Sequence, residues 1–113
     1  MKISPSGENK FIVRGFKSLQ VLNNHWREHS VEYPNFNIKD YEQKALELIE
    51  SATDKNILGH LDKTGAIIRY NKLTNDFVKG RPAKGIFTMF KPDEGILYYE
   101  TRRKEDIEYG GTE

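Results

Sequence analysis

The second half of the chain is a series of short strand-like runs separated by turn residues, and this pattern constrains the fold most. Apolar and β-branched residues mark candidate strands at 57–61, 66–70, 75–79, 85–90 and 96–100. The segments between them are only a few residues long and rich in Gly, Asn and Asp. Connections this short favour antiparallel neighbours. We therefore expect an antiparallel sheet of four to five strands.

Two helices are expected before this sheet. Phe16, Leu19, Leu22 and Trp26 recur at helical spacing, which predicts an amphipathic helix over 16–29. Asn37 is a good N-cap for a second helix over the apolar stripe that ends at residue 52. A short strand is also expected at 10–14. The predicted fold class is α+β, with two N-terminal helices packed on the antiparallel sheet.

Length and composition suit one compact domain. The chain has 113 residues, 36% of them hydrophobic, and we place the domain at residues 10–104. Residues 1–9 are small and polar, as in a linker or the start of an excised domain, and residues 105–113 form an expected acidic, solvated tail. There is no cysteine, no signal-peptide pattern and no apolar run long enough to span a membrane.

Positive charge is concentrated in the middle of the chain. The net charge is only +1, but six basic residues and one acidic residue lie between positions 69 and 91. A local basic patch, and not the total charge, is what meets phosphates. Arg81 and Lys84 are therefore candidate RNA contacts, although a charged face that only keeps the domain soluble is an equally simple interpretation.

His25 and His29 stand one helical turn apart, so both rings are expected on the same helix face. Histidine titrates near neutral pH and can act as a general acid or a general base. A zinc site is disfavoured, because Trp26 stands where a metalloprotease helix needs Glu and no third ligand is evident. We predict no metal and no cofactor. His60, in a candidate strand, is expected to be incidental.

Several other side chains could complete a site for a phosphodiester. Lys91 and Arg69 are candidates for stabilising phosphorane charge, and Thr88 for donating to a phosphate oxygen. Strand alternation places Thr88 and Phe90 on one face, where Phe90 could stack on a base. Candidate contacts with RNA are also Arg27, Tyr70 and Tyr98.

The order of several short motifs resembles a known family. These motifs are Arg27-Glu28-His29, Glu32-Tyr33, Arg69-Tyr70-Asn71, Thr74-Asn75, the run from Gly85 to Lys91, and Tyr98-Tyr99-Glu100. Between residues 16 and 100 the chain resembles the tRNA-cleaving domain of colicin D-type bacteriocins. More broadly, it is similar to the barnase–colicin–RelE superfamily of toxin nucleases, which includes C-terminal domains of contact-dependent inhibition and other polymorphic toxins.

This resemblance implies a metal-independent endoribonuclease acting on tRNA. By the match, His29 is the catalytic histidine, Thr88 the assisting hydroxyl residue, and Phe90-Lys91 the family's aromatic-lysine step. The lysines that precede the family's histidine are here Arg27 and Glu28, and His25 has no counterpart, so the general acid stays open. Such a toxin is delivered as part of a larger protein, acts in the cytoplasm of a target cell, and has a cognate immunity protein and in some cases a host activating factor.

Two other functions remain open from the residues alone. A non-catalytic RNA-binding or protein-interaction module could use the same basic sheet, and its function would survive His29→Ala. A metal-dependent nuclease could use His25 and His29, and it would lose its activity in EDTA.

Overall fold

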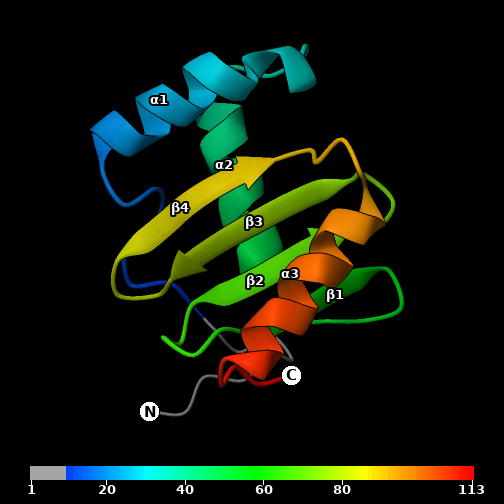
Figure 1. Ribbon diagram of the computed structural model, residues 1–113. Helices are drawn as coiled ribbons and strands as arrows, with labels where there is room; N and C mark the ends of the chain where they lie inside the picture. Colours follow the sequence, from blue (N-terminus) through cyan, green and yellow to red (C-terminus); the bar gives the residue numbers. More distant parts are fainter. Residues whose placement is uncertain (1–9) are drawn as a thin grey trace.

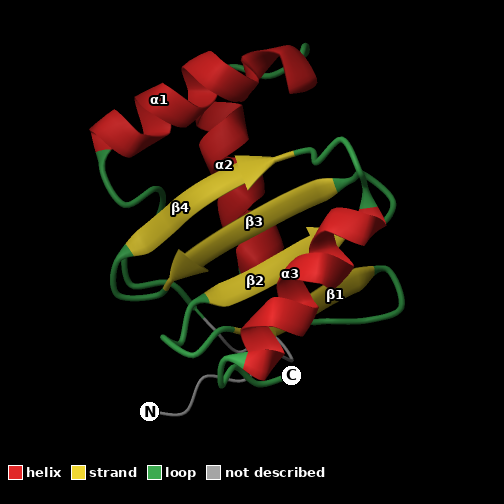
Figure 2. Ribbon diagram, viewed as in Figure 1, coloured by secondary structure: helices red, strands yellow, loops and turns green. Residues whose placement is uncertain are grey.

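The computed structural model describes residues 10–113, which form a four-stranded sheet with helices on both faces (Figures 1 and 2). The linker predicted at residues 1–9 lies outside the described residues. The elements, in order, are α1 (Leu19–His29), the 3-10 turn η1 (Ser30–Glu32), α2 (Ile38–Ile49), β1 (Ile57–Leu61), β2 (Ile67–Asn71), β3 (Asp76–Arg81), β4 (Gly85–Phe90) and α3 (Ile96–Glu108).

The sheet is an antiparallel meander in the order β1-β2-β3-β4. The α+β class with an antiparallel sheet is therefore confirmed. The ranges 57–61 and 85–90 were predicted as strands with the bounds that β1 and β4 have, whereas β2 and β3 each begin one residue later than expected. A bulge at Phe87 interrupts the pairing of β3 with β4, because Lys79 pairs with Thr88 while Gly80 pairs with Ile86.

The two faces of the sheet carry separate apolar clusters. Figure 1 shows α2 crossing behind the sheet, α1 along the β4 side and α3 across the front. Ile67, Val78 and Met89 point toward α1 and α2, and they belong to the larger cluster with Tyr41 and Ile49. The smaller cluster lies under α3 and consists of Ile68, Tyr70, Phe77 and Tyr99, with Leu58, Phe90 and Tyr98 packed against it.

Capping residues determine where the two N-terminal helices begin. Ser18 caps α1 and accepts a hydrogen bond from Val21 N, so the helix begins at Leu19 and not at Phe16. Asn37 and Asp40 form a capping box at the start of α2, as the cap at Asn37 predicted. Phe16 still packs in the core from outside the helix, where its backbone bridges Ile86 of β4.

Two strand predictions are wrong. Residues 10–14 form no strand. Phe11 is nevertheless buried, and the amides of Ile12 and Val13 both donate to Pro82 O. Residues 96–100 are instead the first turns of α3, whose adjacent residues Tyr98 and Tyr99 pack on the sheet. Tyr99 is buried there, while Ile96 and Leu97 remain exposed.

The prediction of a solvated tail at residues 105–113 is also wrong, because α3 extends into this segment. The domain end predicted at residue 104 lies inside α3, which continues to Glu108, and Thr112 then pairs with Leu61 of β1. His60, fully buried in β1, contacts Tyr99 Oη and Asp106 Oδ2 at 3.1 and 2.7 Å and so fastens α3 to the sheet. The end of the described chain is therefore packed against the domain.

Candidate functional site

His25 and His29 lie on one face of α1, as the i, i+4 spacing predicted, and their rings stack on each other. Their ring centroids are 5.8 Å apart and the ring planes are inclined by 17°. Both side chains are half-buried between α1 and the end of β4. Each imidazole has a different polar partner, and this difference gives the two rings different chemistry.

His25 lies against Thr88. The Thr88 hydroxyl is 3.2 Å from His25 Nδ1. Thr88, which was predicted to lie in a strand, therefore contacts a histidine of α1 directly. Burial lowers the pKa of His25 below its ordinary value of 6.5, and the nearby His29 ring lowers it further, against an opposing effect of Glu28. His25 is therefore a neutral imidazole at neutral pH and can accept a proton.

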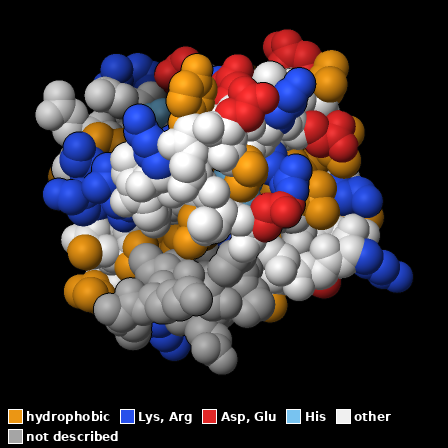
Figure 3. Space-filling model, turned by 60° about the horizontal axis from the view of Figure 1, so that its bottom comes forward, with side chains coloured by type: hydrophobic (Ala, Val, Ile, Leu, Met, Phe, Trp, Pro, Cys, Tyr) orange, Lys and Arg blue, Asp and Glu red, His pale blue; other side chains and the backbone are white. Residues whose placement is uncertain are grey.

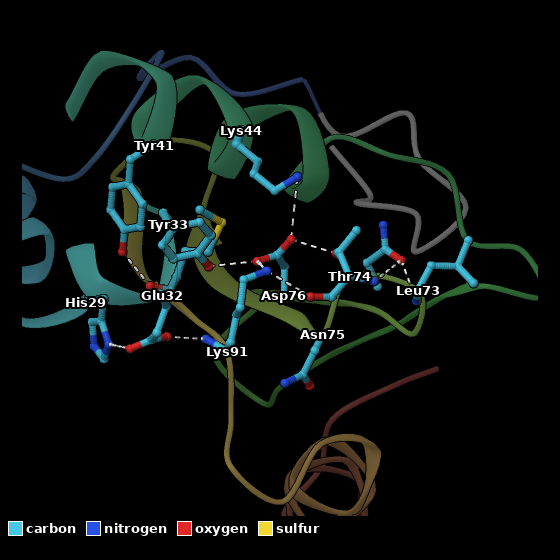
Figure 4. Close-up of polar contacts among 12 residues, drawn as sticks. His29, Glu32, Tyr33, Tyr41, Lys44, Leu73, Thr74, Asn75, Asp76 and Lys91 are labelled. Atoms are coloured by element: carbon cyan, nitrogen blue, oxygen red, sulfur yellow. Dashed lines mark hydrogen bonds and ion pairs between the residues drawn. The ribbon is translucent and has the colours of Figure 1, made fainter. Parts of the chain in front are cut away.

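His29 is held by a carboxylate. Glu32, one turn farther in η1, lies with its Oε2 2.7 Å from His29 Nδ1 (Figure 4). The other oxygen, Oε1, accepts a hydrogen bond of 2.7 Å from the backbone N–H of Lys91. Glu32 thus orients the imidazole and joins the end of α1 to the end of β4, leaving His29 Nε2 as the nitrogen that can exchange a proton.

Phe90 packs against the His29 ring. Its ring is stacked on His29 with centroids 5.5 Å apart, and it meets Tyr98 edge-on at 5.4 Å. Thr88 and Phe90 therefore do share a face, as strand alternation predicted. Phe90 is largely occupied by these aromatic neighbours, so its main structural effect is to hold His29 in place.

Lys91 is fixed by a buried carboxylate. Its ammonium donates to Thr74 O at 2.8 Å and to Asp76 Oδ1 at 3.0 Å (Figure 4). Asp76 is 1% exposed and also accepts hydrogen bonds from Tyr33 Oη and Thr74 Oγ1. An ammonium has three N–H donors, so one remains beyond these two hydrogen bonds, and the ammonium also lies 4.8 Å from the centroid of the Tyr33 ring.

His29, Phe90 and Lys91 line a shallow pocket, whereas His25 and Thr88 lie outside its lining. A hollow of about 250 Å³ is lined by His29, Glu32, Phe90, Lys91, Pro92, Asp93, Glu94 and Tyr98. His29 lines this pocket, while the Lys91 ammonium points from it toward Asp76 and Thr74 (Figure 4). Two larger hollows lie elsewhere, and neither is lined by His25 or His29.

Two predicted site residues lie elsewhere. Arg69 is fully buried and donates to Ser51 O and Ile68 O, both at 3.0 Å, so it cannot reach a phosphate beside His29. Burial lowers its pKa to about 10. Tyr70 is also buried, with its ring stacked on Tyr99 and its hydroxyl donating to Asn75 Oδ1, so it offers no face to a base. Both residues stabilise the sheet.

The remaining predicted contacts lie on the surface. Arg27 is exposed on α1, and Lys84 is exposed in the turn between β3 and β4. Arg81 is half-buried beside the Phe87 ring. Tyr98 is half-buried at the rim of the pocket, with the guanidinium of Arg102 over its ring. Of these four residues only Tyr98 lines the pocket beside His29.

Two residues of the site were missed by sequence analysis as functional positions. Glu32 stands three residues after His29, a spacing that brings side chains together on a helical turn, so the signal was present. Asp76 gave no such signal, because its partners come from Tyr33, Lys44 and Lys91, far away along the chain. Only the fold brings these groups together.

The sequence matches no protein-family model and no curated protein. The chemistry of the site therefore rests on its own residues. Within residues 10–113, no group of three or more His, Asp or Glu is placed to hold a metal ion. No helix in the same range is both long and apolar enough to cross a membrane. What the site does contain is a neutral imidazole, a carboxylate-oriented imidazole and an ammonium beside a pocket.

Proposed function

We propose that this protein is a metal-independent endoribonuclease. The observation that carries the proposal is the stacked pair of imidazoles with unlike partners, His25 on Thr88 and His29 on Glu32. RNA cleavage by its own 2′-hydroxyl needs a base, an acid and a cation near the phosphate. Two histidines whose surroundings differ are suited to the first two roles.

In this mechanism the two histidines transfer protons in opposite directions. Neutral His25 accepts the proton of the 2′-hydroxyl as that oxygen bonds to phosphorus. Protonated His29 gives its Nε2 proton to the departing 5′-oxygen as the P–O5′ bond breaks. The products are a 2′,3′-cyclic phosphate and a 5′-hydroxyl end, and His25 and His29 exchange roles when water opens the cyclic phosphate.

Lys91 and Thr88 stabilise the charge that develops on the phosphorane. The free N–H of the Lys91 ammonium donates to a non-bridging oxygen, while Asp76 and Thr74 hold the side chain in position. The Thr88 hydroxyl lies at His25 and can donate to the same phosphate. Glu32 positions His29 and does not itself touch the substrate.

The resemblance to colicin D-type domains extends the proposal to substrate and setting. In this proposal the RNA is tRNA, the domain is the toxic part of a larger secreted or delivered protein, and it acts in the cytoplasm of a target cell. A cognate immunity protein would neutralise it. A host activating factor could also be required for cleavage.

The test is cleavage of purified tRNA in EDTA, with and without cell extract. We expect wild-type protein to give discrete fragments with cyclic phosphate ends. His25→Ala and His29→Ala should each reduce the rate by about 10²–10⁴-fold, the usual range for a general acid or base. Asn24→Ala, at an exposed position of α1, is the matched control and should cleave like wild type.

Three results would contradict the proposal in different ways. Cleavage that EDTA abolishes would indicate a metal-dependent nuclease. Intact tRNA under all conditions, together with salt-dependent binding, would indicate a non-catalytic RNA-binding module. Full activity in His29→Ala would refute the assignment of His29.

A further inference from the structure

A second cationic site lies next to the histidines, around the bulged residue of β4. The Phe87 ring is half-buried at the bulge, with Lys17 Nζ 5.9 Å and the Arg81 guanidinium carbon 5.5 Å from its centroid. Lys84 is exposed in the turn that precedes β4. These four residues, Lys17, Arg81, Lys84 and Phe87, are called the Phe87 site below.

The cations of the Phe87 site have no carboxylate partner among residues 10–113. By contrast, six other basic side chains pair with acids: Arg14, Lys44, Lys79, Lys91, Arg102 and Arg103. Arg81 Nε is buried and lacks a hydrogen-bond acceptor within the described residues, which is costly unless a ligand supplies one. The first turn of α1, directly after Lys17, also contains no acidic residue.

The charge distribution on the surface agrees with these contacts. Figure 3 shows Lys and Arg side chains gathered on the left of the view with few acidic side chains among them, whereas acidic and basic side chains mix on the right. An aromatic ring between two cations holds them at the surface by cation–π attraction. This arrangement prepares an anion site without a permanent counter-charge.

The Phe87 site adjoins the catalytic histidines along two segments. Thr88 follows Phe87 directly and contacts His25. On the other segment, Phe16 precedes Lys17, and its ring centroid is 6.1 Å from that of His25. A polyanion that places one phosphate at His25 can therefore extend over the Phe87 site, a few nucleotides away.

We propose that the Phe87 site binds the phosphate backbone of the RNA substrate beside the scissile bond. This inference rests on the proposed ribonuclease function and specifies its preferred substrate class, which is RNA long enough to span both sites, whereas a dinucleotide occupies the histidine site alone. Arg81 grips a phosphate through its guanidinium, and Lys17 and Lys84 contribute charge. Phe87 positions Lys17 and Arg81.

The test is binding of a tRNA stem-loop that carries 2′-O-methyl groups, which prevent cleavage. Two variants remove charge from the site, Lys17→Gln/Lys84→Gln and Arg81→Gln. The matched control is Lys55→Gln/Lys104→Gln, which removes two exposed lysines elsewhere. We expect the first double variant to bind about tenfold more weakly than the control, with a salt dependence shallower by roughly 1.4–1.8 in log–log slope.

Cleavage supplies the second readout. Variants of the Phe87 site should raise KM for tRNA while leaving the turnover of a dinucleotide unchanged. Affinity and salt slope equal to those of the control double variant would overturn the inference and leave the nuclease proposal standing. Binding that depends on the Phe87 site without any RNA cleavage would support the inference and refute the nuclease proposal. Absence of RNA binding by wild-type protein would refute both.

Discussion

Removal of the Asp76 carboxylate is expected to cause a large loss of stability. It is 1% exposed and lies at the start of β3, where it accepts hydrogen bonds of 2.7 Å from Tyr33 Oη and 2.6 Å from Thr74 Oγ1. Lys91 and Lys44 approach the same group at 3.0 and 3.5 Å. Asp76→Ala removes all of these interactions at once.

The expected magnitude follows from the exposure of each partner. A hydrogen bond to a charged group contributes about 1.5–3 kcal/mol, and Asp76 accepts two from hydroxyls. The lysine side chains are 27% and 32% exposed, so water can solvate them after the mutation and their ion pairs add little. In the variant, burial still raises the pKa of Tyr33, so its hydroxyl keeps its proton and is left without an acceptor. We expect the free energy of unfolding to fall by about 3–6 kcal/mol.

Urea unfolding followed by fluorescence measures this loss. Trp26 is the only tryptophan, and its ring lies 5.3 Å from that of Tyr41 between α1 and α2, so its emission reports on the main core. Asp93→Ala, at an exposed position near the pocket, is the control and should change stability by less than about 0.5 kcal/mol. A loss below about 1 kcal/mol in Asp76→Ala would refute the reasoning that its hydrogen bonds organise this corner of the sheet.

Two further predictions concern residues of β1. Burial lowers the pKa of His60 despite its hydrogen bond to Asp106, so below pH 6.5 the unfolded chain binds a proton that the folded chain does not. Stability should therefore fall as the pH drops below 6.5, and His60→Gln should weaken this dependence in urea titrations at several pH values; an unchanged slope would contradict it. Gly59→Ala would drive its new methyl group against the Arg69 guanidinium and within 2.8 Å of Ile68 O. The same unfolding assay should show a loss of about 1–3 kcal/mol, and equal stability would contradict the packing argument.

Local patterns in the sequence were sufficient for several elements. Asn37 and Asp40 predict the start of α2 because capping needs only residues a few positions apart. The bounds of β1 and β4 follow from apolar runs between turn residues. The shared face of His25 and His29 follows from the helical repeat alone. Each of these features depends on neighbours in the chain.

The wrong predictions concern features that depend on residues far apart in the sequence. Residues 96–100 contain Ile and two Tyr, which favour a strand by propensity, yet they form a helix because Tyr99 packs on Tyr70 across the sheet. Arg69 has the residue type of a phosphate ligand, but its strand places it beneath the surface, where it donates to Ser51 O. Residue type therefore did not predict burial.

The features of the candidate site also fall into those that the sequence determined and those that only the tertiary structure decided. The sequence by itself determined that His25 and His29 share a face of one helix and that Thr88 and Phe90 share a face of one strand, since both periods are properties of a single element. Only the tertiary structure decided that Glu32 joins His29 to Lys91 and that Asp76 holds the Lys91 ammonium. The physical reason is distance along the chain: Glu32 and Lys91 are 59 residues apart, and only the packing of α1 along β4 brings them into contact.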